Sequence, residues 1–313
     1  MKRSRVGTAV AVVLLALMVG YLATQRDLLT ALRSIPPWMV GALIAVSIVG
    51  LVIQSFQFRT AIGIHGIELP LPEATALTVA NTMANYYLPA RGGIVVRAAY
   101  MKRVYRFPLT QYAAVTVSVT GLTMLTAAVF GFFGLLIVGL TDGDVDDRAL
   151  ASFVGVGVAA TLGVVVAIAA TRMFRSGSRL ARIAGEFRSG MSLWANSPAR
   201  LAVFLLWTVL LFGFQAFRLW LSFRAVGVTV ELGSILVIQA LVSVAFILAL
   251  TPGNIGVKEG AIVFAAGFLG VDPGLALLAS LVDRAASLLV TFGGGLLSVR
   301  YLSRRAVEAP DQV

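Results

Sequence analysis

An apolar segment of the chain ends in Thr251-Pro252-Gly253-Asn254-Ile255-Gly256 and resumes, with Lys258 and Glu259, as sequence compatible with a helix. A second apolar segment is interrupted in the same way by Leu88-Pro89-Ala90-Arg91-Gly92-Gly93. Backbone polar groups cannot stay unpaired in hydrocarbon, so a broken helix at membrane depth is tolerated only where protein or a water-filled cavity surrounds it. The two breaks therefore predict one enclosed polar cavity.

The composition excludes a soluble domain. Hydrophobic residues make up 59% of the chain, charged residues only 12%, and the mean hydropathy is +0.93. These values are typical of a polytopic membrane protein. The net charge of +11 comes from basic residues in loops beside the apolar segments, where they set topology, so nucleic acid binding is not predicted. The lack of cysteine and the single histidine, His65, exclude disulfides, thiol nucleophiles and multi-histidine metal sites.

The lengths of the apolar segments predict the number of membrane crossings. A helix needs ~20 residues to cross ~30 Å of hydrocarbon. Six segments meet this requirement: 6–23, 38–58, 109–140, 149–171, 201–223 and 274–299. The segments 74–88 and 235–250 are shorter and run into the breaks, so we interpret each as half of a re-entrant helical hairpin. The expected fold is an all-α polytopic membrane protein with six full transmembrane helices and two re-entrant hairpins.

Charge and internal similarity predict the orientation. Most basic residues beside the spans fall on one side if the N-terminus is cytoplasmic, which places both termini in the cytoplasm. Pro89 and Pro252, and likewise Glu68 and Glu231, occupy matching places in two similar orders of segments. Three crossings separate the breaks, so the hairpins enter from opposite sides. This pattern favours an inverted-topology repeat with a midplane site, as in secondary transporters.

The whole chain, 1–313, is interpreted as one integral membrane domain. Residues 1–37 hold a first helix, retained rather than cleaved as a signal, and an external loop. Residues 38–140 form the first repeat, and 201–299 form the second. Between them, 141–200 contain a connecting helix and a basic amphipathic helix over 180–194, which lies on the inner leaflet or serves as a solvated linker. Residues 300–313 form a cytoplasmic tail.

Seven charged residues lie inside or at the edge of the apolar segments. Each would cost ~2.5 to 3.5 kcal/mol at the bilayer centre, so these side chains should face a cavity or one another. Neighbours on a helix point about 100° apart, and partners must therefore come from other helices. We expect Glu259 to pair with Arg97 or Arg284, and at least one basic residue to stay free for an anion. The seven are Arg91, Arg97, Arg218, Lys258, Glu259, Asp283 and Arg284.

The breaks offer further polar groups. Glycines let backbone N–H groups turn toward a ligand, and a half-helix that starts near Ile94 or Val257 presents its positive end to a phosphate or carboxylate. The glycines concerned are Gly92, Gly93, Gly253 and Gly256. Asn85 and Asn254, beside the breaks, are candidates either for the site or for bonds between helices. For Asn81 and Gln239 we expect ordinary interhelical hydrogen bonds.

The stretch from Thr251 to Glu259 is similar to the TPGGxGxxE-like signature of the lysylphosphatidylglycerol synthase transmembrane family. The stretch from Asn85 to Arg97 resembles that family's upstream motif, a proline followed by Arg-Gly and a later arginine. The resemblance implies a flippase-like domain that moves a lipid between leaflets, without the soluble aminoacyltransferase domain of some members. By position it points to Arg97, Pro252, Gly253, Gly256, Glu259 and Arg284. Asn254 replaces a glycine and Lys258 adds a charge, which favours a more anionic headgroup.

The expected function is a flippase or scramblase of the cell membrane for an anionic lipid or a polyprenyl phosphate. An ion-coupled transporter of a small soluble anion remains an alternative, with Glu259 or Asp283 as proton carrier. A noncatalytic partner of a glycosyltransferase or lipid-modifying enzyme is another. No catalytic constellation is evident, so neither enzymatic activity nor a cofactor or metal is predicted. The candidate binding residues are Asn85, Arg91, Gly92, Gly93, Arg97, Pro252, Gly253, Asn254, Gly256, Lys258, Glu259, Asp283 and Arg284.

Overall fold

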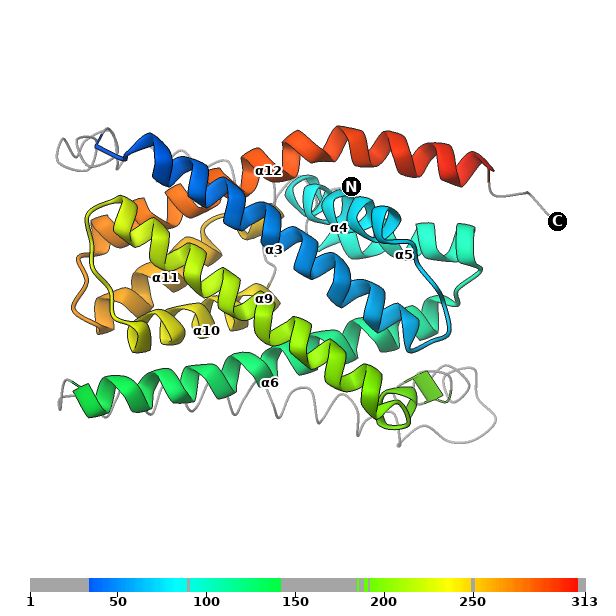
Figure 1. Ribbon diagram of the computed structural model, residues 1–313, viewed down its shortest axis with the longest axis horizontal. Coiled ribbons are helices and arrows are strands. Elements are labelled where there is room, and N and C mark those ends of the chain that lie inside the picture. Colours follow the sequence, from blue (N-terminus) through cyan, green and yellow to red (C-terminus); the bar gives the residue numbers. More distant parts are fainter. Residues whose placement is uncertain are drawn as a thin grey trace.

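The computed structural model describes residues 34–88, 91–141, 185, 189–190, 192–248 and 251–308, and its regular structure in these ranges is entirely helical (Figure 1). Four of the described helices are long and apolar enough to cross a membrane. They are α3 (Pro37–Gly63), α6 (Leu109–Thr141), α9 (Pro198–Ala225) and α12 (Pro273–Glu308). These helices confirm the predicted segments 38–58, 109–140, 201–223 and 274–299. The predicted spans 6–23 and 149–171, and most of the predicted helix 180–194, lie outside the described residues.

Both predicted breaks are confirmed. Helix α4 (Leu71–Tyr87) is followed by α5 (Gly92–Tyr105), and α10 (Leu232–Leu248) is followed by a single 3₁₀ turn, η1 (Pro252–Asn254), and then α11 (Val257–Phe268). Each of these helices is shorter than the ~20 residues needed to cross the hydrocarbon. The chain turns at the breaks through positive φ angles, 55° at Arg91 and 61° at Gly253.

Proline and short polar residues determine where the helices begin. Pro37, Pro72, Pro198 and Pro273 lie in the first turns of α3, α4, α9 and α12. Proline is favoured there because its missing N–H would have no partner within the helix. At α12 the Asp272 side chain accepts a hydrogen bond from the Leu275 amide at 2.9 Å, which caps the helix.

The packing of the helices agrees with an internal repeat. Helix α3 packs on α9, α4 packs on α12, and α10 packs on α6. If α3 is exchanged with α9, α4 with α10 and α6 with α12, this set of pairings is unchanged. Figure 1 shows the result: α6 and α12 lie along opposite edges, and the two broken helices lie between them. The exchange maps the long and broken helices within 37–141 onto those within 198–308.

Large apolar side chains cover much of the outer surface. Phe132, Leu289 and Leu296 are examples, with exposed fractions of 57%, 61% and 72%. Charged residues such as Glu73, Glu259 and Asp283 are instead almost fully buried. Apolar residues outside and charges inside are the distribution that hydrocarbon surroundings require. The protein is an integral membrane protein with several apolar helices.

Trp194 ends the predicted amphipathic helix 180–194, which the sequence places on the inner leaflet or as a solvated linker. The residue is 5% exposed, and its ring packs edge-on to Phe204 of α9, with centroids 4.8 Å apart. It therefore contacts protein. His65 lies in the turn after α3 and packs edge-on to Phe107, with ring centroids 5.6 Å apart. Burial lowers the pKa of its imidazole.

Candidate functional site

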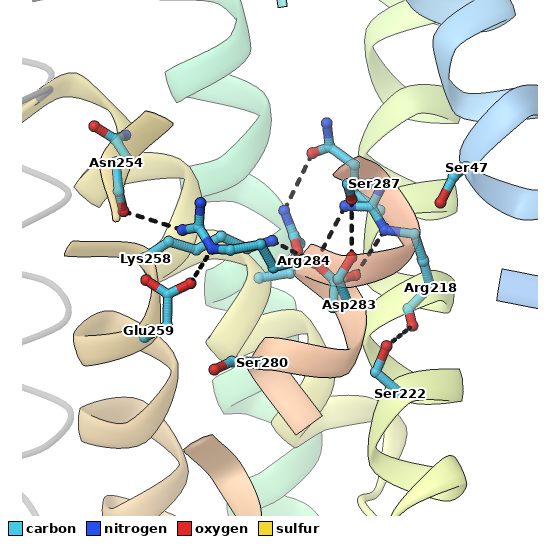
Figure 2. A network of polar contacts seen from close by, with 12 residues as sticks. Ser47, Arg218, Ser222, Asn254, Lys258, Glu259, Ser280, Asp283, Arg284 and Ser287 are labelled. Atoms are coloured by element: carbon cyan, nitrogen blue, oxygen red, sulfur yellow. Dashed lines mark hydrogen bonds and ion pairs between the residues drawn. The ribbon is translucent and has the colours of Figure 1, made fainter. Parts of the chain in front are cut away.

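Helices α9, α11 and α12 bring two basic side chains together around one carboxylate (Figure 2). Asp283 of α12 accepts a hydrogen bond on Oδ1 from Nε of Arg218 at 2.6 Å. Its other oxygen, Oδ2, accepts from Nη2 of Arg218 at 3.3 Å and from Nζ of Lys258. One carboxylate thus holds two cations that belong to different helices. We call Arg218, Lys258 and Asp283 the Asp283 triad.

A second ion pair closes the break before α11. Nε of Arg284 donates to Oε1 of Glu259, while its two Nη atoms donate to the carbonyl oxygens of Gly253 at 3.0 Å and Asn254 at 3.2 Å. Oε2 of Glu259 accepts from the Gly256 amide at 2.8 Å, which caps the start of α11. The backbone groups freed by the break are therefore satisfied by two side chains. This is how irregular backbone is tolerated at membrane depth.

These contacts confirm two predictions. Glu259 pairs with Arg284, one of the two partners expected for it. Neither Lys258 with Glu259 nor Asp283 with Arg284 pairs within its own helix, because consecutive side chains point in different directions. Together these five side chains carry three positive and two negative charges, and each forms an ion pair. The group as a whole keeps one excess positive charge.

The two ion-pair groups differ in how far they are open to the surroundings. The side chains of Arg218 and Lys258 are 19% and 14% exposed, whereas that of Asp283 is 2% exposed. In the second pair, Arg284 and Glu259 are 5% and 2% exposed. The cations of the Asp283 triad are therefore partly exposed. The Arg284–Glu259 pair is sealed.

The two breaks lie against each other. Nη2 of Arg91, in the first break, donates to the carbonyl oxygen of Phe246 in α10, and Asn254 in the second break donates to the same oxygen at 3.5 Å. Tyr86, at the end of α4, lies so close to Gly253 that a Cβ atom there would meet its ring at 2.3 Å. Gly253 is thus required both by its positive φ and by this close approach. The two breaks are therefore in direct contact.

Arg97 lies apart from the five-residue group. Its guanidinium is centred 4.1 Å above the ring of Phe58 in α3, a cation–π contact, and Tyr112 of α6 is also nearby. Its Nε atom is buried and has no hydrogen-bond partner among the described residues. Within the same ranges Arg97 and Arg91 form no ion pair with a carboxylate. Two basic residues at the first break thus match the expectation of an unpaired cation.

The asparagines and glycines at the breaks bond mainly within the protein. Oδ1 of Asn85 accepts from the Gly93 amide at 2.9 Å, so this amide and that of Gly256 are bonded rather than directed at a ligand. Gln239 of α10 donates to Gln215 of α9 at 3.1 Å, which confirms the expected interhelical bond. Asn81 differs from expectation, since its buried Oδ1 has no partner in the described part of the chain.

The structure also shows a buried carboxylate that the sequence analysis did not select. Glu73, in the first turn of α4, is 1% exposed and accepts a hydrogen bond from the Tyr100 hydroxyl of α5 at 2.6 Å. An acidic residue in a first helical turn is common at exposed positions, so its type and place did not distinguish it. The apolar residues on both sides of Glu73 in the sequence could have indicated that this carboxylate is buried. The contact fastens α4 to α5 at the ends remote from the break.

Buried ion pairs beside the second break, within a bundle of apolar helices, are typical of an integral membrane protein with polar groups in its interior. The chain belongs to the family described as the lysylphosphatidylglycerol synthase TM region, whose model matches residues 6–295. The recognition made from the two break motifs is therefore confirmed.

Two curated relatives align with almost the whole chain. The chain is 26% identical to the glycosyltransferase AglD of Haloferax volcanii, in an alignment that covers 98% of this chain and 56% of AglD. It is 21% identical to a UPF0104 membrane protein of Methanothermobacter thermautotrophicus, with 97% of this chain and 95% of that protein covered. The chain thus spans little more than half the length of AglD. No solved structure matches it.

Proposed function

We propose that this protein moves an anionic or phosphate-bearing lipid between the two leaflets, and that it acts as a flippase or scramblase rather than as an enzyme. The headgroup passes along the site where the two breaks meet, and the acyl or prenyl tails stay in the surrounding lipid. The membership of the lysylphosphatidylglycerol synthase TM family supports a lipid as substrate. The excess of basic over acidic side chains at the site favours a negatively charged headgroup.

The observation that carries this proposal is the pair of arginines at the first break without a carboxylate partner. A buried cation is costly unless an anion or aromatic face offsets its desolvation. Arg97 has only the Phe58 ring and the nearby Tyr112, and Arg91 has a carbonyl oxygen. An anionic headgroup would supply the missing charge. The same reasoning applies to a polyprenyl phosphate and to a phospholipid.

The proposed topology has six crossings, two re-entrant hairpins, and both termini in the cytoplasm at the plasma membrane. It rests on the charge asymmetry of the loops and on the two short broken helices. It also rests on the helix pairings, which stay the same when the helices of one half are exchanged for those of the other. Because the chain has no cysteine, single cysteines can be introduced near each end without background. Labelling of both by a membrane-impermeant maleimide in intact cells would contradict this orientation.

Native mass spectrometry of the gently purified protein tests the binding step. The wild-type protein should retain one anionic lipid species, and Arg97→Ala should lose it. Arg224→Ala is a matched control, because Arg224 also lies over an aromatic ring, that of Trp220 at 5.1 Å, but is exposed at the end of α9. Bulk lipid retained equally by all three proteins would reject the role of Arg97.

Reconstituted vesicles test the transport step. The lipid identified by binding, labelled in its headgroup, should change leaflet faster in vesicles that contain the wild-type protein than in empty vesicles or in vesicles with Arg97→Ala. Equal rates with the wild-type protein and with Arg97→Ala would reject the assigned path. Equal rates with and without the wild-type protein would reject the flippase function itself.

The similarity to AglD favours a second candidate, a membrane partner that supplies a lipid substrate to a glycosyltransferase. In AglD, named a glycosyltransferase, a region like this chain accounts for 56% of the protein and is joined to further sequence. A chain of the present kind would then act together with a separate enzyme. Crosslinking in native membranes tests this function, and recovery of a glycosyltransferase with the wild-type chain would support it.

A further inference from the structure

The Asp283 carboxylate lies where a bound anion would be expected. Arg218 contacts it through two guanidinium nitrogens and Lys258 through its ammonium group, a donor set that would suit a phosphate group equally well. The two cations come from α9 and α11, and both are partly exposed. The carboxylate between them is not.

We propose that Arg218 and Lys258 form a phosphate-binding site in which Asp283 is a built-in competitor, so that one proton is taken up for each phosphate bound. This inference rests on the proposed function and adds a coupling ion to it. An incoming phosphate group forms ion pairs with Arg218 and Lys258 and so replaces Asp283 as their partner. The carboxylate is then left buried without a partner, and it accepts a proton from water because an unpaired buried charge is too costly. When the phosphate leaves, the proton is released and the ion pairs re-form.

The exchange conserves the charge of the site. A phosphodiester carries one negative charge, as does the carboxylate that it displaces, and the proton neutralises Asp283. The five side chains alone carry one excess positive charge before binding, and the five side chains together with the bound phosphodiester carry the same excess afterwards. A monoanionic phosphodiester headgroup fits this balance.

Among the titratable groups at this site, Asp283 is the one that takes the proton. Arg218 faces it from α9 and Lys258 from α11, while Arg284 and Glu259 are occupied with each other. From α4 the Tyr86 ring lies close to Gly253 and interacts electrostatically with the same charges. Helix α3 has no titratable side chain before Arg59, and α10 has none at all.

Calorimetry on the purified full-length protein tests the coupling. Dihexanoyl phosphatidylglycerol serves as lipid probe and dimethyl phosphate as its soluble counterpart, because neither titrates between pH 5 and 8. Measurement in two buffers of different ionisation enthalpy gives the number of protons exchanged. We expect uptake of about one proton per phosphodiester and a roughly tenfold weaker affinity for each rise of one pH unit. Uptake near zero in the wild-type protein would overturn the proposal without the use of any variant.

Variants test the assignment to Asp283. Asp283→Asn imitates the protonated carboxyl, so it should bind the probe at least as tightly as the wild type, with no proton uptake and no pH dependence. Arg218→Gln should bind at least tenfold more weakly, and Arg224→Gln, a change at an exposed position of the same helix, should behave as wild type. A pH dependence that persists in Asp283→Asn would overturn the proposal. So would a wild-type protein that binds neither probe.

The two probes separate this inference from the proposed function. Binding of phosphatidylglycerol with proton uptake, at higher affinity than dimethyl phosphate, supports both. If both probes bind equally with proton uptake, the Asp283 triad is an anion site for a soluble phosphate. This result supports the coupling and contradicts the proposed lipid function. Lipid movement in vesicles by a protein that binds without proton uptake keeps the function and rejects the coupling.

Discussion

Arg91 donates a hydrogen bond to the carbonyl oxygen of Phe246, 155 positions away in the chain, and its guanidinium is also centred 5.4 Å from the ring of the same residue. A single side chain thereby joins the first break to the helix that precedes the second. The backbone of Arg91 lies in the left-handed region, with φ of 55°, which residues other than glycine and asparagine rarely adopt. The contacts of the Arg91 side chain with Phe246 therefore require a strained backbone at Arg91.

Replacement of Arg91 separates these two effects. Arg91→Ala should lower the free energy of unfolding by about 1 to 3 kcal/mol, because both contacts with Phe246 are lost while the unfavourable φ remains. Arg91→Gly loses the same contacts but adopts the positive φ freely, so it should be about 1 kcal/mol more stable than the alanine variant. Chemical unfolding in detergent micelles measures both. An alanine variant as stable as the glycine variant would contradict the assigned backbone strain.

Loss of one member of the buried Arg284–Glu259 pair should reduce the stability of the protein more than the pair itself contributes to it. Glu259→Gln or Arg284→Met alone leaves one buried charge without its partner, at a cost of about 3 to 5 kcal/mol. The double variant should lose at least about 1 kcal/mol less than the sum of the two single losses. Thermal unfolding of the four proteins in one detergent measures the coupling. Additive losses would show that the two side chains act independently.

Helices α6 and α10 approach closely at two glycines. A Cβ atom on Gly134 would lie 2.7 Å from the carbonyl oxygen of Gly233 and 2.9 Å from Cβ of Leu236. Gly134→Ala should therefore destabilise the protein by about 1 to 3 kcal/mol, since the helices must separate to accept the methyl group. Gly213→Ala in α9 is the control, because nothing lies within 4 Å of the added atom. The control should be unchanged or up to about 1 kcal/mol more stable.

The bond between Tyr100 and Glu73 gives a further prediction. Tyr100→Phe removes a donor from a carboxylate that is 1% exposed, so the protein should lose about 1 to 3 kcal/mol of stability. Tyr87→Phe, at a position that is 63% exposed, should have no measurable effect. Hydrogen exchange should show the loss first at the contact between α4 and α5. Equal stability of the two variants would show that the Tyr100 hydroxyl contributes nothing to that contact.

The sequence was sufficient to locate the four long helices and the two breaks that the structure describes. Proline and glycine act on the local backbone, so the end of α4 before Pro89 and the start of α11 after Gly256 follow from residue type alone. Span lengths follow equally from local hydropathy. Both properties are visible within a window of about 20 residues.

The partners of the charged residues could be predicted only in part. Sequence shows that Asp283 and Arg284 point in different directions, but it does not show which helix each faces. Glu259 was expected to pair with Arg284 or Arg97, and the structure places Arg97 on Phe58 instead. The shared use of Asp283 by Arg218 and Lys258 was not foreseen, because it depends on the packing of three helices that are distant in the sequence.

Asp283 and Arg284, consecutive on α12, fasten this helix to α9 on one side and to α11 on the other. Rotation of α12 about its axis, or a slide of one helical turn, would break every one of these ion pairs at once. The second-half helices α9, α11 and α12 should therefore move as one rigid unit while the Asp283 triad is closed. An opening of the proposed path would then occur along the seam with α4, where Tyr86 meets Gly253. Displacement of Asp283 by a bound anion would release α9 from α12 and allow a second kind of motion that the empty protein lacks.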